Sequence, residues 1–276
     1  MCIIIKRKIS VVTVCYNAAS LIGETILSVI NQTYPNLEYI IIDGKSKDNT
    51  VNIIKKYESK ITRWISEPDE GIYYAMNKGL KYATGDYVIF MNAGDTFCHE
   101  KILEEFVPQI DEDTIVAYGD IYMVKEHYKY RAAHMSEELL EEKMPFCHQA
   151  TFVRLNYHKK HPFDTSFKIV SDYNLFYHAY FTEKVKFQYV HCAVANFDSR
   201  GLSSANFRLT RREWLRVNGL QHDWIYRIKK ELTFISWDIK RWVKHHLMSE
   251  KSVAEIEIKR LRKKGIKEII ITSTDL

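Results

Sequence analysis

The sequence is poor in the residues that build cross-linked or fibrous proteins: it holds 5 Cys, 5 Pro and 10 Gly among 276 residues. The cysteines are scattered and include no Cys-x-x-Cys pair, so we expect neither a zinc site nor a disulfide framework. Free thiols fit a reducing cytoplasm. No apolar run approaches the roughly 18 residues of a membrane-spanning helix, and the apolar part of Met1–Lys8 is too short for a signal peptide. We therefore expect a soluble or peripheral protein.

Two common nucleotide-binding motifs are also missing. No Gly-x-Gly-x-x-Gly follows the first predicted strand, which argues against a dinucleotide site of the Rossmann type. No Gly-x-x-x-x-Gly-Lys-[Ser/Thr] occurs either, which excludes a P-loop NTPase. A nucleotide bound by this chain would be held mostly by side chains and a metal ion.

The net charge of +5 is unevenly distributed along the chain. Residues 1–200 carry a net charge of −3, residues 201–249 carry +6 and residues 250–276 carry +2. A basic C-terminal part argues against a general nucleic-acid binder and for a local contact with an anionic partner.

Strand patterns and helical patterns alternate four times within the first hundred residues, which predicts right-handed βαβ units and a parallel sheet. The predicted strands are 9–16, 38–43, 61–66 and 87–91. A polar residue stands at or just after the end of each strand: Asn17, Asp43, Asp69 and Asp95. In an open α/β sheet such ends meet at the edge where ligands bind. Alternatively, each residue caps a helix or a turn.

Asp95 is the most informative of these residues. It follows an apolar strand, Tyr87–Met91, and a tight polar turn that Gly94 permits. A carboxylate in this place suits a hard divalent cation, because Mg²⁺ takes one or two protein carboxylates plus phosphate oxygens. The alternative is that Asp95 caps the helix predicted near Lys101.

Three stretches carry a family resemblance: ISVVTVCYNAA, YIIIDGKSKDNT and SEPDEGIYYAMNKGLKYATGDYVIFMNAGD. They resemble the N-terminal half of the family-2 glycosyltransferases, closely over residues 9 to about 107 and more weakly through 205. The resemblance implies an α/β fold of the GT-A type, Rossmann-like, with a mostly parallel central sheet and flanking helices. Its catalytic domain would be residues 1–205, with a nucleotide-sugar half of about 1–107 and an acceptor half of about 108–205. The resemblance ends there, and charge and apolar periodicity predict that residues 206–276 form a basic amphipathic helical extension.

The resemblance also implies roles for single residues. Asp95 would bind Mg²⁺ or Mn²⁺, with Asn92 standing where relatives often have a second carboxylate. His148 and Gln149 resemble a His-Gln pair on the acceptor or diphosphate side. Gly44 and Tyr74 stand where relatives often have Asp. The residues expected along the nucleotide sugar are Thr13, Asn17, Asp43, Asp69, Lys78 and Asn92.

Arg200 is a further candidate, from the chain itself and not from the resemblance. It lies in a polar loop, 197–204, whose glycine could act as a hinge, so the loop could close over the donor and bring Arg200 to the phosphate charge. Alternatively, 197–204 is an exposed linker loop.

Asp172 is the predicted general base. It lies at the start of a predicted helix, where relatives carry an Asp that takes the proton from the acceptor hydroxyl. Two alternatives stay open: Asp172 is an N-cap, and His148 is a hydrogen-bonded core residue.

The C-terminal segment 209–247 interleaves Trp with Lys and Arg, and apolar residues recur there at helical spacing between Ile225 and Trp242. This composition is typical of an amphipathic helix on an anionic membrane surface. Alternatively, the same stripe packs on the catalytic domain or on a second subunit of a homo-oligomer.

Together these features predict a metal-dependent inverting glycosyltransferase. It would move a hexosyl or N-acetylhexosaminyl group from a nucleoside diphosphate sugar, with UDP favoured, to a hydroxyl of a glycan or lipid-linked glycan. The expected setting is bacterial surface-polysaccharide synthesis, in the cytoplasm and peripheral on the inner face of the membrane. The alternative is a catalytically degenerate glycan-binding or scaffold protein of the same fold. A nucleotidyltransferase is disfavoured because residues 14–19 lack a Gly-rich loop followed by a basic residue.

Overall fold

The computed structural model describes residues 7–198, 206–220 and 248–272. The chain forms two compact units. The first contains Met1–Tyr122 and Ala133–Asp198, and the second contains Met123–Ala132 and Ser199–Leu276. The second unit therefore includes a short internal segment, 123–132, which the sequence placed in the acceptor half.

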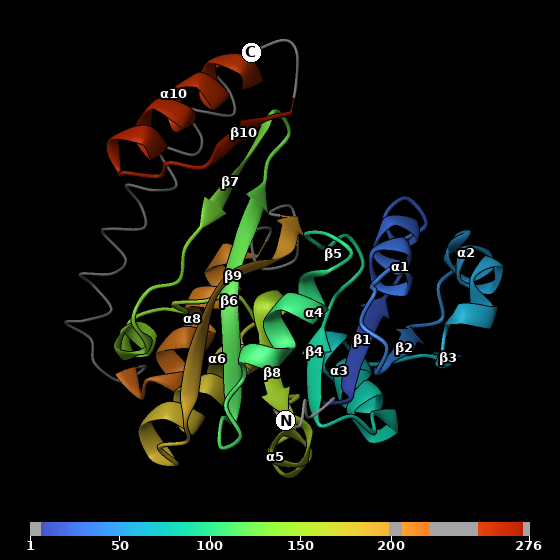
Figure 1. The fold of residues 1–276 in the computed structure, drawn as a ribbon. Coiled ribbons are helices and arrows are strands. Elements are labelled where there is room, and N and C mark those ends of the chain that lie inside the picture. Colours follow the sequence, from blue (N-terminus) through green and yellow to red (C-terminus); the bar gives the residue numbers. More distant parts are fainter. Residues whose placement is uncertain (1–6, 199–205, 221–247, 273–276) are drawn as a thin grey trace, which may run out of the picture. The chain divides into compact units, whose positions relative to one another are not determined.

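A central sheet organises the first unit (Figure 1). Its strand order is β6-β8-β4-β1-β2-β3. Strands β1, β2, β3 and β4 run parallel to one another, whereas β8 runs antiparallel to both of its neighbours, β4 and β6. A further antiparallel pair, β5 and β9, joins the sheet through β6. The bounds are β1 (Ile9–Cys15), β2 (Leu37–Asp43), β3 (Arg63–Ser66), β4 (Tyr87–Phe90), β5 (Thr96–Phe97), β6 (Val116–Val124, with its last two residues in the second unit), β8 (Thr151–Arg154) and β9 (Phe187–Asp198).

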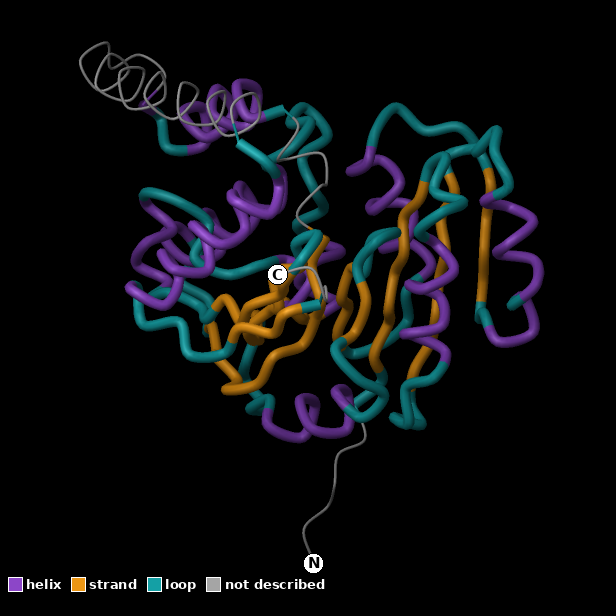
Figure 2. The backbone as a smooth tube through the Cα atoms, turned by 90° about the horizontal axis from the view of Figure 1, so that it is seen from above, coloured by secondary structure: helices purple, strands orange, loops and turns teal. Residues whose placement is uncertain are grey.

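Helices lie on both sides of these strands (Figure 2). They are α1 (Ile22–Ile30), α2 (Thr50–Lys56), α3 (Ile72–Tyr82), α4 (Ile102–Phe106), α5 (Leu155–Lys160) and α6 (Ser171–Tyr177). Short helical turns connect them: η1 (Glu58–Lys60), η2 (Val107–Gln109), η3 (Glu137–Glu141), η4 (His148–Ala150) and η5 (His178–Thr182). Every residue of β1 is buried, as expected for a strand covered on both faces.

The packing of α3 on β1 depends on a glycine. A Cβ atom added to Gly79 would lie 2.4 Å from Val12 Cγ1, closer than atoms pack. The missing side chain lets the helix lie directly on the strand. Val12 on the strand and Met76 and Leu80 on the helix are all buried, as close packing of the two elements requires.

In the second unit, β7 (Tyr128–Ala132) pairs antiparallel with β10 (Ile269–Ile271). The unit also contains α8 (Phe207–Val217) and α10 (Glu250–Lys263). Tyr128, Ala254 and Ile258 form a small buried cluster between β7 and α10. The Tyr128 hydroxyl also donates to Glu257 Oε2 at 2.7 Å, which ties the strand to the helix.

The expected alternation of parallel strands and helices is confirmed in the first unit. Strand β8 begins only at Thr151, because residues 148–150 form the turn η4. Strand β9 continues to Asp198 and takes in the start of the predicted loop 197–204. The predicted stripe between Ile225 and Trp242 lies outside the described residues. No helix among the described residues is long and apolar enough to cross a membrane.

Candidate active site

The loops after β1 and β2 are held together by side chains at the carboxyl edge of the sheet. Asn17, which has a positive φ of 48°, receives Lys47 N–H on its Oδ1 at 2.8 Å. Its own backbone N–H donates to Ser46 Oγ at 2.8 Å. Asn17 therefore lies at the carboxyl edge of the sheet and is bonded to the loop after β2, as its position at a strand end predicts.

Asp43 is completely buried, with 0% of its surface exposed. Its carboxylate receives four hydrogen bonds, from Ser46 N–H, Ser46 Oγ, Ser66 Oγ and the Cys15 thiol. Burial, with the charge of Asp43, raises the pKa of Cys15, so this thiol stays protonated and donates. A carboxylate offers about four acceptor sites, so Asp43 is saturated by the protein. In this structure it orders the loops after β2 and β3 and presents no surface to a ligand.

Thr13 is also fully buried, and its hydroxyl donates to Met91 O at 2.7 Å inside the sheet. Asp69 lies at the edge, where its Oδ1 receives Gly71 N–H at 3.0 Å. A Cβ on Gly44 would lie 2.7 Å from Asp69 Oδ2, so the glycine makes room for this carboxylate. Lys78 Nζ is 3.0 Å from Glu67 Oε1 and donates to a backbone carbonyl. Asp69 and Lys78 are both partly exposed, whereas Thr13 is buried.

Asp95 lies after β4 and is only 5% exposed. Its Oδ2 accepts from Gln149 Nε2 at 3.0 Å, and its Oδ1 accepts from Asp198 N–H at 3.1 Å. Neither contact is a helix cap, so the capping alternative for Asp95 is excluded by its partners. Burial raises the pKa of Asp95 to about 6, although the two N–H donors oppose this shift.

The surroundings of Asp95 fit a divalent cation. A second carboxylate, Asp198, faces the same turn, because its Oδ2 would lie 3.9 Å from a Cβ on Gly94. The charge of Asp198 adds to the raised pKa of Asp95. A cation beside these oxygens would offset both the burial and the repulsion, and carboxylate oxygens are the ligands that Mg²⁺ and Mn²⁺ prefer.

Asp172 lies in the first turn of α6, next to His148. Its Oδ2 is 2.9 Å from His148 Nδ1. Its Oδ1 accepts from Tyr173 N–H at 2.9 Å and lies 3.1 Å from the Tyr73 hydroxyl. The residue at the N-cap of α6 is Val170, so Asp172 is not the N-cap. His148, with a side chain 21% exposed, is not a core residue.

The turn η4 joins the two carboxylates of the site. Its consecutive residues His148 and Gln149 contact Asp172 and Asp95, respectively. His148 Nε2 also lies 3.2 Å from Asn92 Nδ2, on the turn that leads to Asp95. One short turn therefore fixes a candidate base and a candidate metal ligand side by side.

A family model described as glycosyl transferase family 2 matches residues 10–186. The chain belongs to glycosyl transferase family 2. A PGL/p-HBAD biosynthesis glycosyltransferase of Mycobacterium bovis is 25% identical over 198 residues, which cover 70% of this chain and 77% of that protein. An uncharacterized glycosyltransferase of Haemophilus influenzae is 29% identical over 115 residues, or 41% of this chain and 46% of the relative.

Two solved structures resemble this glycosyltransferase in fold. S. aureus TarS 1–349 in complex with UDP has a TM-score of 0.59 and 21% identity, covering 78% of this chain and 65% of that chain. The mannosyltransferase PcManGT from Pyrobaculum calidifontis, in complex with GDP-Man and Mn²⁺, has a TM-score of 0.58 and 19% identity, covering 76% and 62%. This chain spans a little under two thirds of both structures. The likeness confirms the expected GT-A fold.

Two side chains of this glycosyltransferase site are absent from the sequence prediction. Tyr73 lies beside Asp172, and Asp198 lies beside Asp95. Asp198 could have been suspected as an acidic residue at the end of a strand, whereas no local pattern marks Tyr73. Arg200 lies outside the described residues, so its expected role at the donor stays a prediction.

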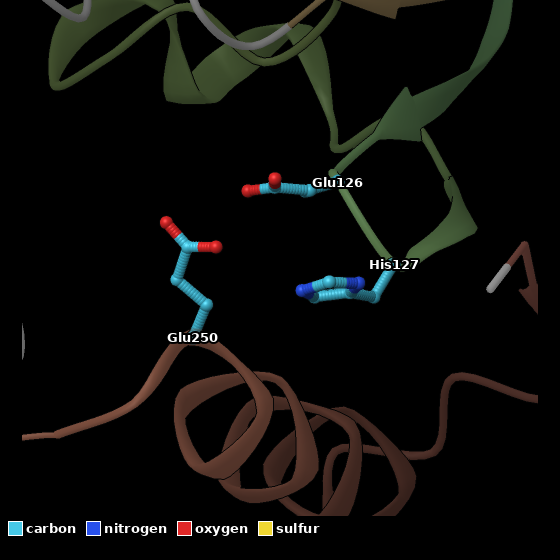
Figure 3. A group of neighbouring side chains, drawn as sticks. All are labelled: Glu126, His127 and Glu250. Atoms are coloured by element: carbon cyan, nitrogen blue, oxygen red, sulfur yellow. The ribbon is translucent and has the colours of Figure 1, made fainter. Parts of the chain in front are cut away.

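A separate group of possible ligands lies in the second unit. Glu126, His127 and Glu250 bring their ligand atoms within 4.8 Å of one another, and Figure 3 shows the three side chains converging. Both glutamates are exposed, and exposed acidic groups of this kind are common without a bound ion.

Proposed function

We propose that this glycosyltransferase moves a sugar from a nucleoside diphosphate sugar to a hydroxyl group, with inversion at the anomeric carbon. Inversion requires a base that takes the hydroxyl proton on one face of the sugar while the nucleoside diphosphate leaves from the other. The Asp172–His148 pair is the proposed proton acceptor, and Asp95 lies on the proposed diphosphate side.

The observation that carries the proposal is the double role of the turn η4. His148 contacts Asp172 at 2.9 Å, and Gln149 contacts Asp95 at 3.0 Å. The reaction needs a proton acceptor and a diphosphate-binding group close together, and consecutive residues place two such carboxylates. Asp95 and Asp198 would hold Mg²⁺ or Mn²⁺, and a bound cation would neutralise charge on the leaving diphosphate.

The proposed donor is a nucleoside diphosphate sugar, and UDP stays the nucleotide expected from the sequence. TarS binds UDP and UDP-GlcNAc, whereas PcManGT binds GDP-Man, so the neighbours support a nucleotide sugar without distinguishing the base. Because Asp43 is saturated by Ser46, Ser66 and Cys15, we assign it to shaping the loop that a nucleoside would meet. Asn17 and Asp69, at the same edge, are the proposed direct contacts.

For the acceptor we propose a glycan or lipid-linked glycan, as in bacterial surface-polysaccharide synthesis. The support is the basic, Trp-rich segment 209–247, whose composition suits an anionic membrane surface. Residues 221–247 lie outside the described part of the chain, so membrane contact and self-association of this segment stay predictions.

Calorimetric titration with UDP, GDP and CDP, each with and without Mn²⁺, tests the proposal. We expect one nucleotide to bind in a metal-dependent manner, and we expect Asp95→Ala to abolish that binding. Asp164→Ala, which changes an exposed carboxylate, is the matched control. If no nucleotide binds to the folded wild type, the degenerate scaffold becomes the better explanation.

A further inference from the structure

The turn between β6 and β7 carries two metal-binding side chains that face a third on α10 (Figure 3). Glu126 and His127 lie on this turn, and Glu250 is the first residue of α10; all three belong to the second unit. We propose that these residues bind one divalent transition-metal ion of the zinc class, which ties the turn to the helix. The site takes no part in the proposed sugar transfer, so the inference goes beyond that function.

The backbone of the turn is fixed on both sides. Lys125 N–H donates to Tyr128 O at 2.9 Å, which closes the turn that contains Glu126 and His127. Thr272 N–H, which follows β10, donates to His127 O at 2.9 Å. The two ligands on the turn are therefore presented by an ordered backbone.

The start of α10 is equally well ordered. Ser249 is its N-cap, and the Oγ of Ser249 accepts from Ser252 N–H at 3.2 Å. The Tyr128 hydroxyl, which belongs to the residue next to His127, donates to Glu257 Oε2 at 2.7 Å on the same helix. This contact and the buried cluster between β7 and α10 hold the helix against the strand. A metal ion would thus meet ligands that are already in place, which lowers the entropy cost of binding.

The distances between the ligand atoms suit a shared cation. One carboxylate oxygen from each glutamate and one imidazole nitrogen all lie within 4.8 Å of one another. Zn–N and Zn–O bonds measure about 2.0–2.2 Å, so two ligand atoms on one zinc ion lie about 3.3–4.3 Å apart. Both glutamates are exposed, and small rotations of their side chains close the remaining gap.

The three side chains also lack other partners. None of them forms a hydrogen bond or an ion pair with any residue in the described ranges. Other carboxylates of the same unit are paired, because Glu257 accepts from a tyrosine hydroxyl and Glu268 has an arginine 3.8 Å away. Glu126 and Glu250 instead converge on each other, and like charges at this separation repel. A shared cation would remove this repulsion.

The helix dipole explains only one member of the group. A carboxylate in the first turn of a helix is stabilised by the helix N-terminus, which accounts for Glu250. It gives no reason for Glu126 and His127 to face that turn from a different element. Exposed carboxylates alone often gather without an ion, whereas a histidine beside two of them supplies the nitrogen ligand of a metal site.

The mixture of ligands determines the class of ion. Mg²⁺ and Ca²⁺ prefer oxygen ligands alone. An imidazole nitrogen suits zinc and the metals next to it, and Mn²⁺ stands at the weak end of their affinity order. Three protein ligands leave a position for water, as in open zinc sites.

An ion at this site would stabilise a small packing unit. The buried cluster between β7 and α10 contains three residues within the described ranges: Tyr128, Ala254 and Ile258. Small cores often depend on a metal ion or a disulfide for stability. Because the ion needs ligands from both elements, its binding free energy is added to the stability of their contact. We therefore expect zinc to protect the turn and the start of α10 from local opening.

Calorimetric titration of the metal-free full chain with Zn²⁺ tests the proposal. The wild type and Asp95→Asn should both bind Zn²⁺, because Asp95→Asn removes only the candidate cation site after β4. His127→Ala and Glu250→Gln should each weaken this binding by about 100-fold or more, the upper end of what the loss of an outer-shell partner costs. The controls are Glu255→Gln, at an exposed position of the same helix, and His178→Ala, at an exposed histidine. Both controls should bind Zn²⁺ as the wild type does.

Hydrogen exchange measured by mass spectrometry gives a second readout that is independent of activity. Zn²⁺ should slow exchange in residues 125–128 and 249–256 of the wild type, and it should not do so in His127→Ala.

Three results would overturn the proposal: no binding at millimolar Zn²⁺, unchanged binding in His127→Ala, or loss of all Zn²⁺ binding in Asp95→Asn. Equal affinity for Mg²⁺ and Zn²⁺ would overturn the assigned class of ion. None of these measurements uses a nucleotide, so failure here and failure of the proposed function are separate outcomes.

Discussion

Replacing Asp95 with Asn should stabilise the ligand-free protein at neutral pH while it removes the proposed cation site. The carboxyl group is 5% exposed, and burial raises its pKa from 3.8 to about 6. A shift of about 2 units corresponds to roughly 3 kcal/mol of unfavourable free energy for the charged form. Asn carries no charge, but its NH₂ would face Gln149 Nε2, which removes about 1 kcal/mol of hydrogen bonding. The expected net gain is about 2 kcal/mol above pH 7.

The sign of this stability difference, and its dependence on pH, follow from proton linkage. Between about pH 4 and pH 6, the folded wild type keeps a proton on Asp95 that the unfolded chain has lost. The contribution of Asp95 to the free energy of unfolding therefore falls as the pH rises through this window, and it levels off above pH 6. The Asn variant lacks this slope, so the two proteins should differ most at neutral pH and least near pH 4.

Urea unfolding at a series of pH values, without added metal, measures this difference. Asp164→Asn, at an exposed position, controls for the loss of one surface charge. Addition of Mn²⁺ and UDP should stabilise the wild type and leave Asp95→Asn unchanged. A wild type and an Asn variant whose free energies of unfolding run parallel from pH 4 to pH 8 would refute the buried-charge argument.

Two further predictions concern the scaffold. Burial alone would raise the pKa of Glu38, but its bonds with Lys8, Ser10 and Thr84 lower this pKa to about 2. The ionised Glu38 therefore contributes fully to the free energy of unfolding above pH 4.5, and this contribution is lost as the pH falls toward 2. Glu38→Gln should therefore lose about 3 kcal/mol at pH 7 and unfold less steeply with acid, as denaturation at several pH values would show. Gly79→Ala should lose about 1–3 kcal/mol in thermal unfolding, because the new methyl group meets Val12 Cγ1 at 2.4 Å. A Gly79→Ala protein as stable as the wild type would contradict the close packing of α3 on β1.

The sequence alone determined the parallel sheet and the strand-end residues. Apolar runs of strand formers, polar turns and helical periodicity act over a few residues, so they can be read from neighbouring positions. The placement of Asn17 and Asp95 at one sheet edge follows from this alternation together with the right-handed crossover rule. The same local patterns could not reveal that Asp43 is saturated, because its partners Ser46 and Ser66 come from two different loops.

Only the tertiary structure decided how the reactive groups are paired. Gln149 lies 54 residues from Asp95 in sequence, Tyr73 lies 99 from Asp172, and the Asp198 N–H lies 103 from Asp95. Contacts at such separations depend on how the turn η4 and the end of β9 approach the sheet, and no short pattern encodes that approach. The chemistry follows from this distinction. The sequence supplied the carboxylates. Their packing against His148, Gln149 and each other determines which carboxylate is buried, which is paired with a neighbour, and which can bind a cation or take part in proton transfer.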